Sequence, residues 1–212
     1  SAASDVYKRQ VLYWVGLFGL VAAWILAGRQ VINPQLKNPQ PNGGLRSIRI
    51  MLSAWIVPLL FAAPLASRDV YSYLMQGAMV RDGFDPYTEG AAVNPGPFLL
   101  EVSHDWRNTT TPYGPLHLWM AEAVTRVVGD NVAAGIIIYK AISLLGFAVI
   151  AWAIVHLTRA LGGDPALALW LGVANPVVVL HLVAGMHNES VMVALVSLGL
   201  LAAVKKLSLI HI

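Results

Sequence analysis

Hydrophobic positions along this chain gather into five long runs that are separated by polar segments. The runs cover residues 11–27, 48–66, 132–157, 166–183 and 190–204. About 20 consecutive apolar residues, folded as a helix, cross the hydrocarbon core of a bilayer. Since that core offers no water to satisfy backbone groups, runs of this kind must cross as helices. The pattern therefore predicts an all-α integral membrane protein, a polytopic helical bundle with a single transmembrane domain over residues 11–206.

The segment between the second and third runs, residues 67–131, has helical patterns of its own. From Val70 to Arg81 the spacing is helical, with one face formed by Val70, Leu74, Gly77 and Arg81. This pattern favours an amphipathic helix at the membrane surface. Pro115 is suited to the first turn of a second helix, which extends to about Val128. That helix is short and carries charged residues, so we expect it to lie along the membrane surface instead of crossing. The whole segment is thus predicted to be a large loop that carries short surface helices.

The charges in the polar segments orient these helices. Residues 28–49 contain four cations and no acid, whereas acids outnumber cations over residues 67–112. By the positive-inside rule the first segment is cytoplasmic and the second is extracytoplasmic. Two lysines after the last run then also lie on the cytoplasmic side. The same assignment places residues 185–189 on the outer face, together with residues 67–131.

Composition supports this class of protein and excludes others. Of the 212 residues, 57% are hydrophobic and 12% are charged, whereas a soluble domain carries roughly twice that charge. The net charge of +3 comes from few residues spread over several loops, so it reports topology and no nucleic-acid partner. The sequence contains no cysteine, which excludes disulfides and thiolate chemistry. We interpret residues 1–10 and 207–212 as non-native ends, and favour a transmembrane helix over a signal-peptide core for the first run.

Asp69 follows the second run directly, so its carboxylate is expected at the membrane surface. One interpretation of Asp69 is structural, because an acid in the first turn of a helix complements the helix dipole. The other is a general base at the lipid–water boundary. The neighbouring Tyr71 and Tyr73 fit a substrate site, but an aromatic belt at the membrane interface would contain such residues as well.

Further polar and aromatic residues of the large outer loop are open to two interpretations. Asp85, Tyr87 and Tyr113 lie in turn and helix-start signals, which are weak indications of function when taken singly. Trp106 could stack on a sugar or simply anchor the chain at the interface. Only their arrangement in space would separate these alternatives.

Histidines and a lysine near the apolar runs are candidates of another kind. His181, His187 and Glu189 could suggest metal ligands, but their spacing matches no familiar zinc pattern, so we expect no metal. Lys140 lies within the third run, roughly 12 Å below its outer end at the α-helical rise. A cation at that depth either extends its stem toward the surface or binds a lipid phosphate.

Three motifs of familiar enzyme classes do not occur in the sequence. They are the Asp-x-Asp metal–nucleotide motif, the Gly-x-x-x-x-Gly-Lys phosphate loop and the Gly-x-Ser-x-Gly nucleophile elbow. A nucleotide-sugar enzyme, an ATPase and a serine hydrolase are therefore not supported by any motif in this sequence.

Five motifs follow one another in a fixed order. They are Ser-Arg-Asp-Val-Tyr-Ser-Tyr at 67–73, Asp85-Pro86-Tyr87, Trp106 followed by Pro112-Tyr113-Gly114-Pro115-Leu116, Asn175-Pro176, and His181 with Gly185-Met186-His187-Asn188-Glu189. In this order they resemble the actinobacterial polyprenol-phosphate-mannose-dependent α-1,6-mannosyltransferases, integral-membrane glycosyltransferases of the GT-C fold. Each motif alone is loose, whereas five in register are specific to that group. Members of the family are considerably longer, which implies that the sequence is a fragment.

The resemblance implies a GT-C-like fold and mannosyl transfer at the outer face of the cell membrane. The donor would be polyprenyl-phosphate-mannose, and the acceptor a mannan or lipomannan of the cell envelope. Asp69 would be the general base of an inverting reaction that needs neither cofactor nor metal. The candidates for the donor phosphate are Arg68, Arg81 and Lys140. The candidates for sugar or acceptor binding are Tyr71, Tyr73, Asp85, Tyr87, Trp106, Tyr113, His181, His187, Asn188 and Glu189.

Other functions stay open from the sequence. A transferase for another polyprenyl-phosphate-linked sugar would share most of the motifs. A lipid-linked sugar transporter or flippase is suggested by Lys140 and by the Asn175-Pro176 break within a run. Transporters place their polar residues near the membrane midplane, whereas most polar residues here cluster at the predicted outer surface. A structural membrane subunit requires that the motifs coincide by chance.

Overall fold

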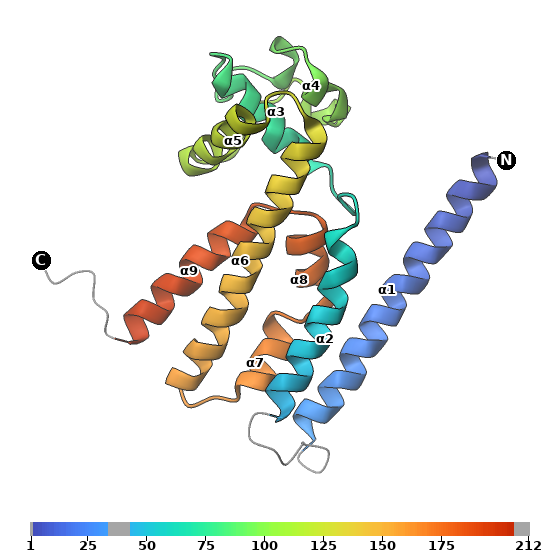
Figure 1. The fold of residues 1–212 in the computed structure, drawn as a ribbon, viewed down its shortest axis with the longest axis vertical. Coiled ribbons are helices and arrows are strands. Elements are labelled where there is room, and N and C mark those ends of the chain that lie inside the picture. Colours follow the sequence, from blue (N-terminus) through green and yellow to red (C-terminus); the bar gives the residue numbers. More distant parts are fainter. Residues whose placement is uncertain (1, 34–42, 206–212) are drawn as a thin grey trace, which may run out of the picture. The chain divides into compact units, whose positions relative to one another are not determined.

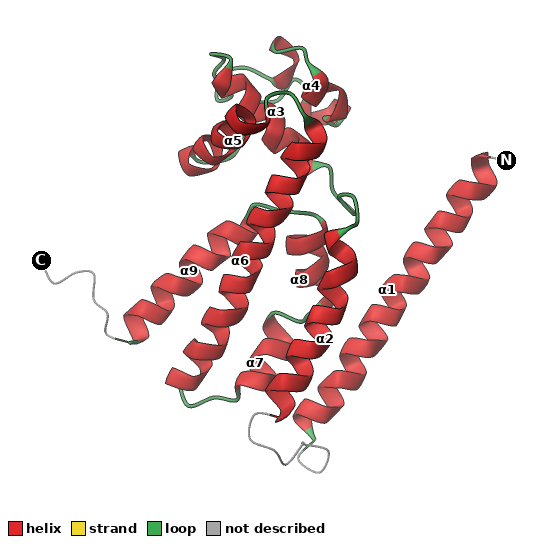
Figure 2. Cartoon of the chain, viewed as in Figure 1, coloured by secondary structure: helices red, strands yellow, loops and turns green. Residues whose placement is uncertain are grey.

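The computed structural model describes residues 2–33 and 43–205. In chain order its elements are α1 (Ala2–Ile32), α2 (Gly43–Leu60), α3 (Asp69–Arg81), η1 (Ala91–Val93), α4 (Pro97–Glu101), η2 (His104–Trp106), α5 (Pro115–Val128), α6 (Val132–Ala160), α7 (Pro165–Gly172), α8 (Pro176–Val179), η3 (Leu180–Ala184) and α9 (Glu189–Val204). Within these ranges every regular element is a helix (Figures 1 and 2), which confirms the all-α prediction. The predicted non-native end at residues 207–212 lies outside the described residues.

Among the described residues, three helices are long and apolar enough to cross a membrane. They are α2, α6 and the part of α1 from Asp5 to Ile32. A fourth crossing results if α7 and the helix Pro176–Ala184, bent by 60° at the break between them, form one span. The apolar helix α9 is shorter than these. The chain is thus a helical membrane protein, as predicted, while the five crossings and their orientation stay a prediction.

Prolines set several of the helix ends. Pro58 lies inside α2, which ends at Leu60, before the end of the apolar run at residue 66. Proline lacks the backbone N–H that continues a helix and clashes with the preceding turn. Pro115 begins α5, and both α3 and α5 lie where the sequence predicts helices. Pro176 begins α8 after Asn175, whose side chain accepts a hydrogen bond from a following backbone N–H.

The chain folds into two compact units. One contains the described parts of Ser1–Val57, Ala151–Val179 and Gly199–Ile212, and the other consists of Pro58–Ile150 and Leu180–Leu198. We call them the α1–α7 unit and the α3–α5 unit. Helices α2, α6 and α9 contribute residues to both.

In the α1–α7 unit, two tryptophans join α1 to α7. The indole rings of Trp24 and Trp170 stack with centroids 4.7 Å apart and an angle of 14° between their planes. The Trp24 indole N–H donates to the Trp170 backbone carbonyl at 3.1 Å, and the Trp170 indole N–H donates to the Trp24 backbone carbonyl at 2.9 Å. Gly28 allows this contact, because a Cβ there would lie 2.2 Å from the Trp170 ring. The pair satisfies both indole donors inside an otherwise apolar contact.

The α3–α5 unit has a dense core, in which α3 packs against α4 and α5 (Figure 1). Its buried side chains include Val70, Tyr73, Leu74, Met75, Ala78, Met79, Phe98, Ala121, Val124 and Tyr139. Gly77 lets the backbones of α3 and α5 approach, since a Cβ there would lie 2.3 Å from the carbonyl oxygen of Ala121. This packing fixes α3, whose first residue is Asp69.

The segment between α2 and α3 is held at two points within the α3–α5 unit. Lys140 is a buried residue, 7% exposed, and its ammonium group donates to the carbonyl of Leu59 at 2.8 Å and to that of Ala62. Leu59 lies in the last turn of α2 and Ala62 follows its end at Leu60, a place where a cation is favourable. The backbone N–H of Leu65 donates to the carbonyl of Ala184 at 3.0 Å. Both contacts lie just before Asp69 in the chain.

Candidate active site

Asp69 is the first residue of α3, and its backbone N–H donates to the Ser67 hydroxyl at 3.1 Å. The side chain of Asp69 is 36% exposed. Ala66, just before it, has a φ of 63°, a left-handed conformation that is uncommon for a residue with a Cβ. The sharp turn at Ala66 and the hydroxyl of Ser67 thus start the helix with Asp69 at its exposed end.

A second loop contributes His187, whose Nδ1 lies 3.2 Å from Oδ2 of Asp69. Burial lowers the pKa of His187 below its ordinary value, and the neighbouring His181 lowers it further, while the nearby carboxylates oppose the shift. Met186 is fully buried with a φ of 54°. Residues in sparsely populated backbone regions persist only where the surroundings hold them, and they cluster at functional sites. The loop is therefore built to hold His187 against Asp69.

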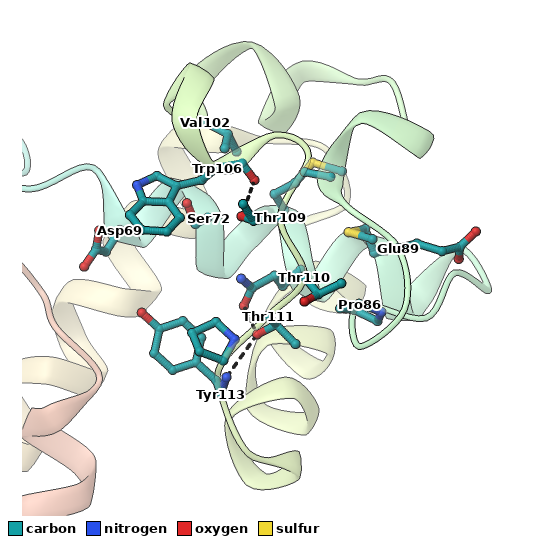
Figure 3. Close-up of a pocket in the computed structure, with 15 residues that line it drawn as sticks. Asp69, Ser72, Pro86, Glu89, Val102, Trp106, Thr109, Thr110, Thr111 and Tyr113 are labelled. Carbon is teal, nitrogen blue, oxygen red and sulfur yellow. Dashed lines mark hydrogen bonds between the residues drawn. The ribbon is translucent and has the colours of Figure 1, made fainter.

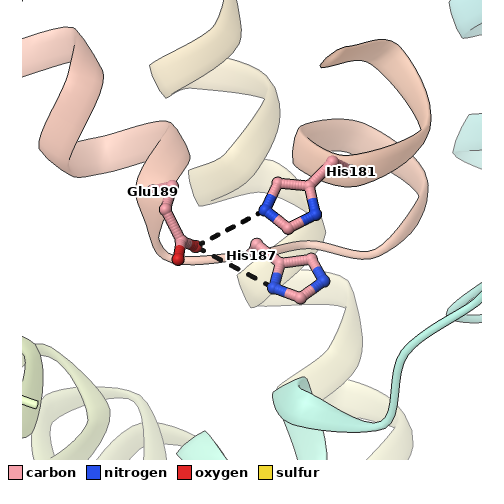
Figure 4. Close-up of side chains that lie close together, drawn as sticks. All are labelled: His181, His187 and Glu189. Carbon is pink, nitrogen blue, oxygen red and sulfur yellow. Dashed lines mark ion pairs between the residues drawn. The ribbon is translucent and has the colours of Figure 1, made fainter. Parts of the chain in front are cut away.

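His181 and Glu189 extend this group of side chains (Figure 4). The imidazole rings of His181 and His187 stack, with centroids 3.8 Å apart and planes 16° apart. One oxygen of Glu189, Oε2, lies 4.0 Å from Nε2 of His181 and 3.8 Å from Nδ1 of His187. That oxygen is buried without a hydrogen-bond partner. One ligand atom from each residue lies within 4.8 Å of the other two.

Asp69 also lines a cavity of about 260 Å³ between α3 and the loop before α5 (Figure 3). Its other lining residues are Ser72, Met75, Gln76, Met79, Pro86, Glu89, Ala91, Val102, Trp106, Thr109, Thr110, Thr111, Pro112 and Tyr113. Aromatic rings with a few polar groups suit a small polar ligand such as a sugar, which needs stacking faces and hydrogen-bond partners. Trp106 and Tyr113 supply the rings, while their roles in sugar binding stay a prediction.

Several polar cavity residues were missed by the sequence reasoning. Ser72, Gln76, Glu89, Thr109 and Thr111 all line it. The Thr111 hydroxyl donates to the Gln76 side-chain carbonyl at 3.1 Å. The only signal in the sequence was the three successive threonines before a proline, a pattern that also fits an ordinary loop.

Tyr73, Tyr113 and His117 form an aromatic cluster, in which Tyr73 and His117 are buried and Tyr113 is half-buried. The ring of Tyr73 contacts both Tyr113 and His117 edge to face, at 5.3 and 4.6 Å between centroids. The backbone N–H of Asn188 lies 3.5 Å from the Tyr73 hydroxyl, and its side-chain amide lies 3.5 Å from Nδ1 of His117. Burial lowers the pKa of His117 to about 4, which keeps the ring neutral at pH 7. Tyr73 lies in the core, so its predicted contact with sugar stays a prediction.

The remaining sugar-binding candidates lie on the outer loop. Asp85 accepts the backbone N–H of Tyr87 at 3.0 Å and the Thr88 hydroxyl at 3.1 Å, and so closes a turn. The Tyr87 ring is 46% exposed. Arg68 lies over the ring of Tyr71, 5.5 Å from its centroid. None of Tyr71, Asp85 and Tyr87 lines the cavity described above.

The three cations predicted to hold the donor phosphate all contact other protein groups. Arg68 donates to the backbone and the carboxylate of Glu101, at 3.0 and 3.2 Å. Arg81 pairs with Asp82 and with Asp130, both at 2.8 Å. These acids raise the pKa of the Arg81 guanidinium above its ordinary value. With Lys140 held at the end of α2, no two of the three cations converge on Asp69, and their phosphate role stays a prediction.

With this geometry established, we compared the chain with known proteins. A sequence profile described as "Alpha-(1->6)-mannopyranosyltransferase, N-terminal domain" matches residues 2–212. The chain belongs to this family. The α-(1→6)-mannopyranosyltransferase A of Corynebacterium glutamicum is 60% identical over 194 residues, which is 91% of this chain and 40% of that protein. The protein of the same name in Mycobacterium tuberculosis is 40% identical over 195 residues, 92% of this chain and 36% of that protein.

A further member, α-(1→6)-mannopyranosyltransferase B of Corynebacterium glutamicum, is 34% identical over 191 residues. That alignment covers 88% of this chain and 32% of that protein. The chain thus spans less than half the length of these curated members of the family. No solved structure matches it. The family resemblance that the five motifs indicate is confirmed.

Proposed function

We propose that this chain carries the catalytic base of a mannosyltransferase that uses polyprenyl-phosphate-mannose as donor. The 6-hydroxyl of an α-1,6-mannan or lipomannan acceptor attacks C1 of the donor mannose, and the bond from C1 to the phosphate oxygen breaks. Polyprenyl phosphate leaves, and the hydroxyl proton passes to Asp69. Attack opposite to the leaving group inverts a β-linked donor into an α-linked product. The family membership and the position of Asp69 support this assignment.

The observation that carries the proposal is the carboxylate of Asp69 on the wall of a cavity with aromatic and hydroxyl groups. The nearby His187 contacts Oδ2 of Asp69 at 3.2 Å, which would fix the direction in which the carboxylate points. A lipid phosphate is a good leaving group, so the reaction needs no strong general acid. One carboxylate is therefore sufficient, in contrast to glycoside hydrolysis, in which two carboxyl groups act.

We place the site on the outer face of the cell membrane, in a protein that crosses the bilayer several times. The four cations over residues 28–49 and the excess of acids over residues 67–112 support this orientation. A donor with a polyprenyl chain would then approach from the bilayer, with its mannosyl phosphate at the level of Asp69. The acceptor would reach the same carboxylate from the aqueous side.

The test is mannosyl transfer in membranes that contain a full-length protein with this sequence. Polyprenyl-phosphate-mannose is supplied with a short α-1,6-mannoside, and the product is identified by its linkage. The expected product is the mannoside extended by one α-1,6-linked mannose. If transfer occurs only from a different polyprenyl-phosphate-linked sugar, the donor is that sugar and not mannose. Translocation of the lipid-linked sugar without any transfer would contradict the proposed function and favour a flippase.

A further inference from the structure

All cations of the α3–α5 unit contact protein groups, although the proposed donor is anionic. Over residues 58–150 and 180–198 the sequence has five arginines and lysines. They are Arg68 at Glu101, Arg81 at Asp82 and Asp130, Arg107 at the carbonyls of Leu100 and Val102, Arg126 at Glu122, and Lys140 at the carbonyls of Leu59 and Ala62. Within this unit, none of the five can turn to a phosphate without weakening a contact that it already makes.

The side chains around Asp69 add negative charge to the place where the phosphate would leave. Asp69 and Glu189 provide two carboxylates, both within 4 Å of His187. The departing phosphate adds further negative charge, while the arginines and lysine of this unit contact other groups. Two positive charges at this place would bring the cluster of two carboxylates to neutrality. A divalent cation supplies that charge and also stabilises a leaving phosphate.

We propose that His181, His187 and Glu189 bind a divalent transition-metal ion beside Asp69. Two imidazoles with carboxylate oxygens are a ligand set that suits Zn²⁺ or Mn²⁺ better than Mg²⁺, which prefers oxygen ligands alone. The buried Oε2 of Glu189 lacks a hydrogen-bond partner and faces both rings (Figure 4). A metal ion between the three residues satisfies that oxygen. Where the ion is bound by Nδ1 of His187, it replaces the contact of that nitrogen with Asp69.

The site closes around the ion by a small rearrangement. Ligand atoms about 2.1 Å from an ion lie about 3.0 to 3.4 Å apart, whereas those of the three residues now lie within 4.8 Å of one another. Two rings stacked 3.8 Å apart and nearly parallel cannot both hold one ion in their planes. The ring of His181 must therefore turn on binding, and its side chain, 46% exposed, has room to do so.

Sequence spacing gave no reason to expect this site, because its ligands converge only through the fold. His181 belongs to the π-helical turn η3, and Glu189 begins α9. Gly185 is needed between them, since a Cβ there would lie 2.7 Å from the His187 ring. The proposed effect of the ion on the leaving phosphate rests on the proposed function, whereas its binding does not.

The test measures metal binding directly in detergent-solubilised full-length protein. The protein is stripped with EDTA and titrated with Mn²⁺, Zn²⁺ or Mg²⁺ by calorimetry, and bound metal is counted by mass spectrometry. His181→Ala and Glu189→Gln change partly exposed side chains and are expected to keep the fold. His104→Ala removes an exposed histidine of η2 and is the matched control. Mannosyl transfer is measured in parallel, with EDTA and after Mn²⁺ is restored.

The expected result is one transition-metal ion per chain in the parent and in His104→Ala. The Kd rises at least about 10-fold in His181→Ala and in Glu189→Gln. Equal binding in all four proteins, or no binding, would overturn the site. Transfer that continues at the parent rate in EDTA would overturn the proposed effect of the ion on the leaving phosphate. Metal binding without transfer would keep the site and count against the proposed function.

Discussion

Two helices of this chain use hydrophobic residues in opposite ways. In α3, Val70, Tyr73 and Leu74 are completely buried against protein. In the most apolar stretch of α1, only 6% of the residues are buried. The α3–α5 unit therefore has a core like that of a water-soluble domain, whereas α1 presents its apolar side chains to the surroundings, as a helix in lipid does. The close approach of backbones is a further difference between the two helices, because Gly77 of α3 lies against Ala121 whereas Gly19 of α1 has no neighbour within 4 Å.

The largest effect that tests this comparison is expected from a glycine substitution. Gly77→Val in α3 drives a side chain into the backbone of α5, because even a Cβ would lie 2.3 Å from the Ala121 carbonyl oxygen. Gly19→Val in α1 meets nothing within 4 Å. Gly77→Val should lower the free energy of unfolding by about 3 kcal/mol or more, measured by denaturation in detergent, and Gly19→Val by far less. Equal effects would contradict the contrast between the two helices.

A pH dependence of similar size is expected from the buried His117. The pKa of its folded form, about 4, lies below the usual value near 6.5, so the unfolded chain binds more protons between these two values. The contribution of His117 to stability is then constant above pH 6.5 and falls as pH decreases from 6.5 to 4, by about 3 kcal/mol in total. His117→Phe should remove most of this decrease in unfolding measured against pH. His104→Ala, at an exposed histidine, should leave it unchanged.

Lys140 gives the next effect. Lys140→Met leaves the carbonyls of Leu59 and Ala62 without their donor and should cost about 2 kcal/mol in stability. Because those carbonyls precede Asp69 by few residues, mannosyl transfer should decline with stability, while Lys140→Arg should keep much of both. A variant that keeps full stability but loses affinity for the donor lipid would instead support the phosphate role predicted from the sequence.

The smallest effect is expected in the α1–α7 unit. Trp170→Phe keeps an aromatic ring against Trp24 but removes the N–H that donates to its carbonyl at 2.9 Å. Hydrogen bonds between helices in lipid are worth about 1 kcal/mol, and the loss should be of that size in unfolding measured in bicelles. A loss as large as that of Gly77→Val would show that this unit also depends on a tight core.

The sequence predicts local features of this molecule better than contacts between distant segments. Helices α3 and α5 follow from residue spacing and from Pro115, because both signals act within one or two turns. The contact of Asp69 with His187 joins residues far apart in the chain. The charge pattern predicts only that both lie on the outer face, and the family resemblance predicts that they share one site. The ion pairs of Arg68 and Arg81 could likewise not be predicted from the sequence, because an exposed cation can pair with any of several acids.

The central claim is that Asp69 accepts the proton of the acceptor hydroxyl. The most direct measurement is the initial rate of mannosyl transfer by full-length Asp69→Asn, compared with Asp105→Asn at the same level of inserted protein. Asp105 is an exposed acid of the same outer loop that does not line the cavity. We expect Asp69→Asn to lower kcat by about 10² to 10⁴-fold and Asp105→Asn to retain the parent rate. A transfer rate near that of the parent in Asp69→Asn would contradict the assignment.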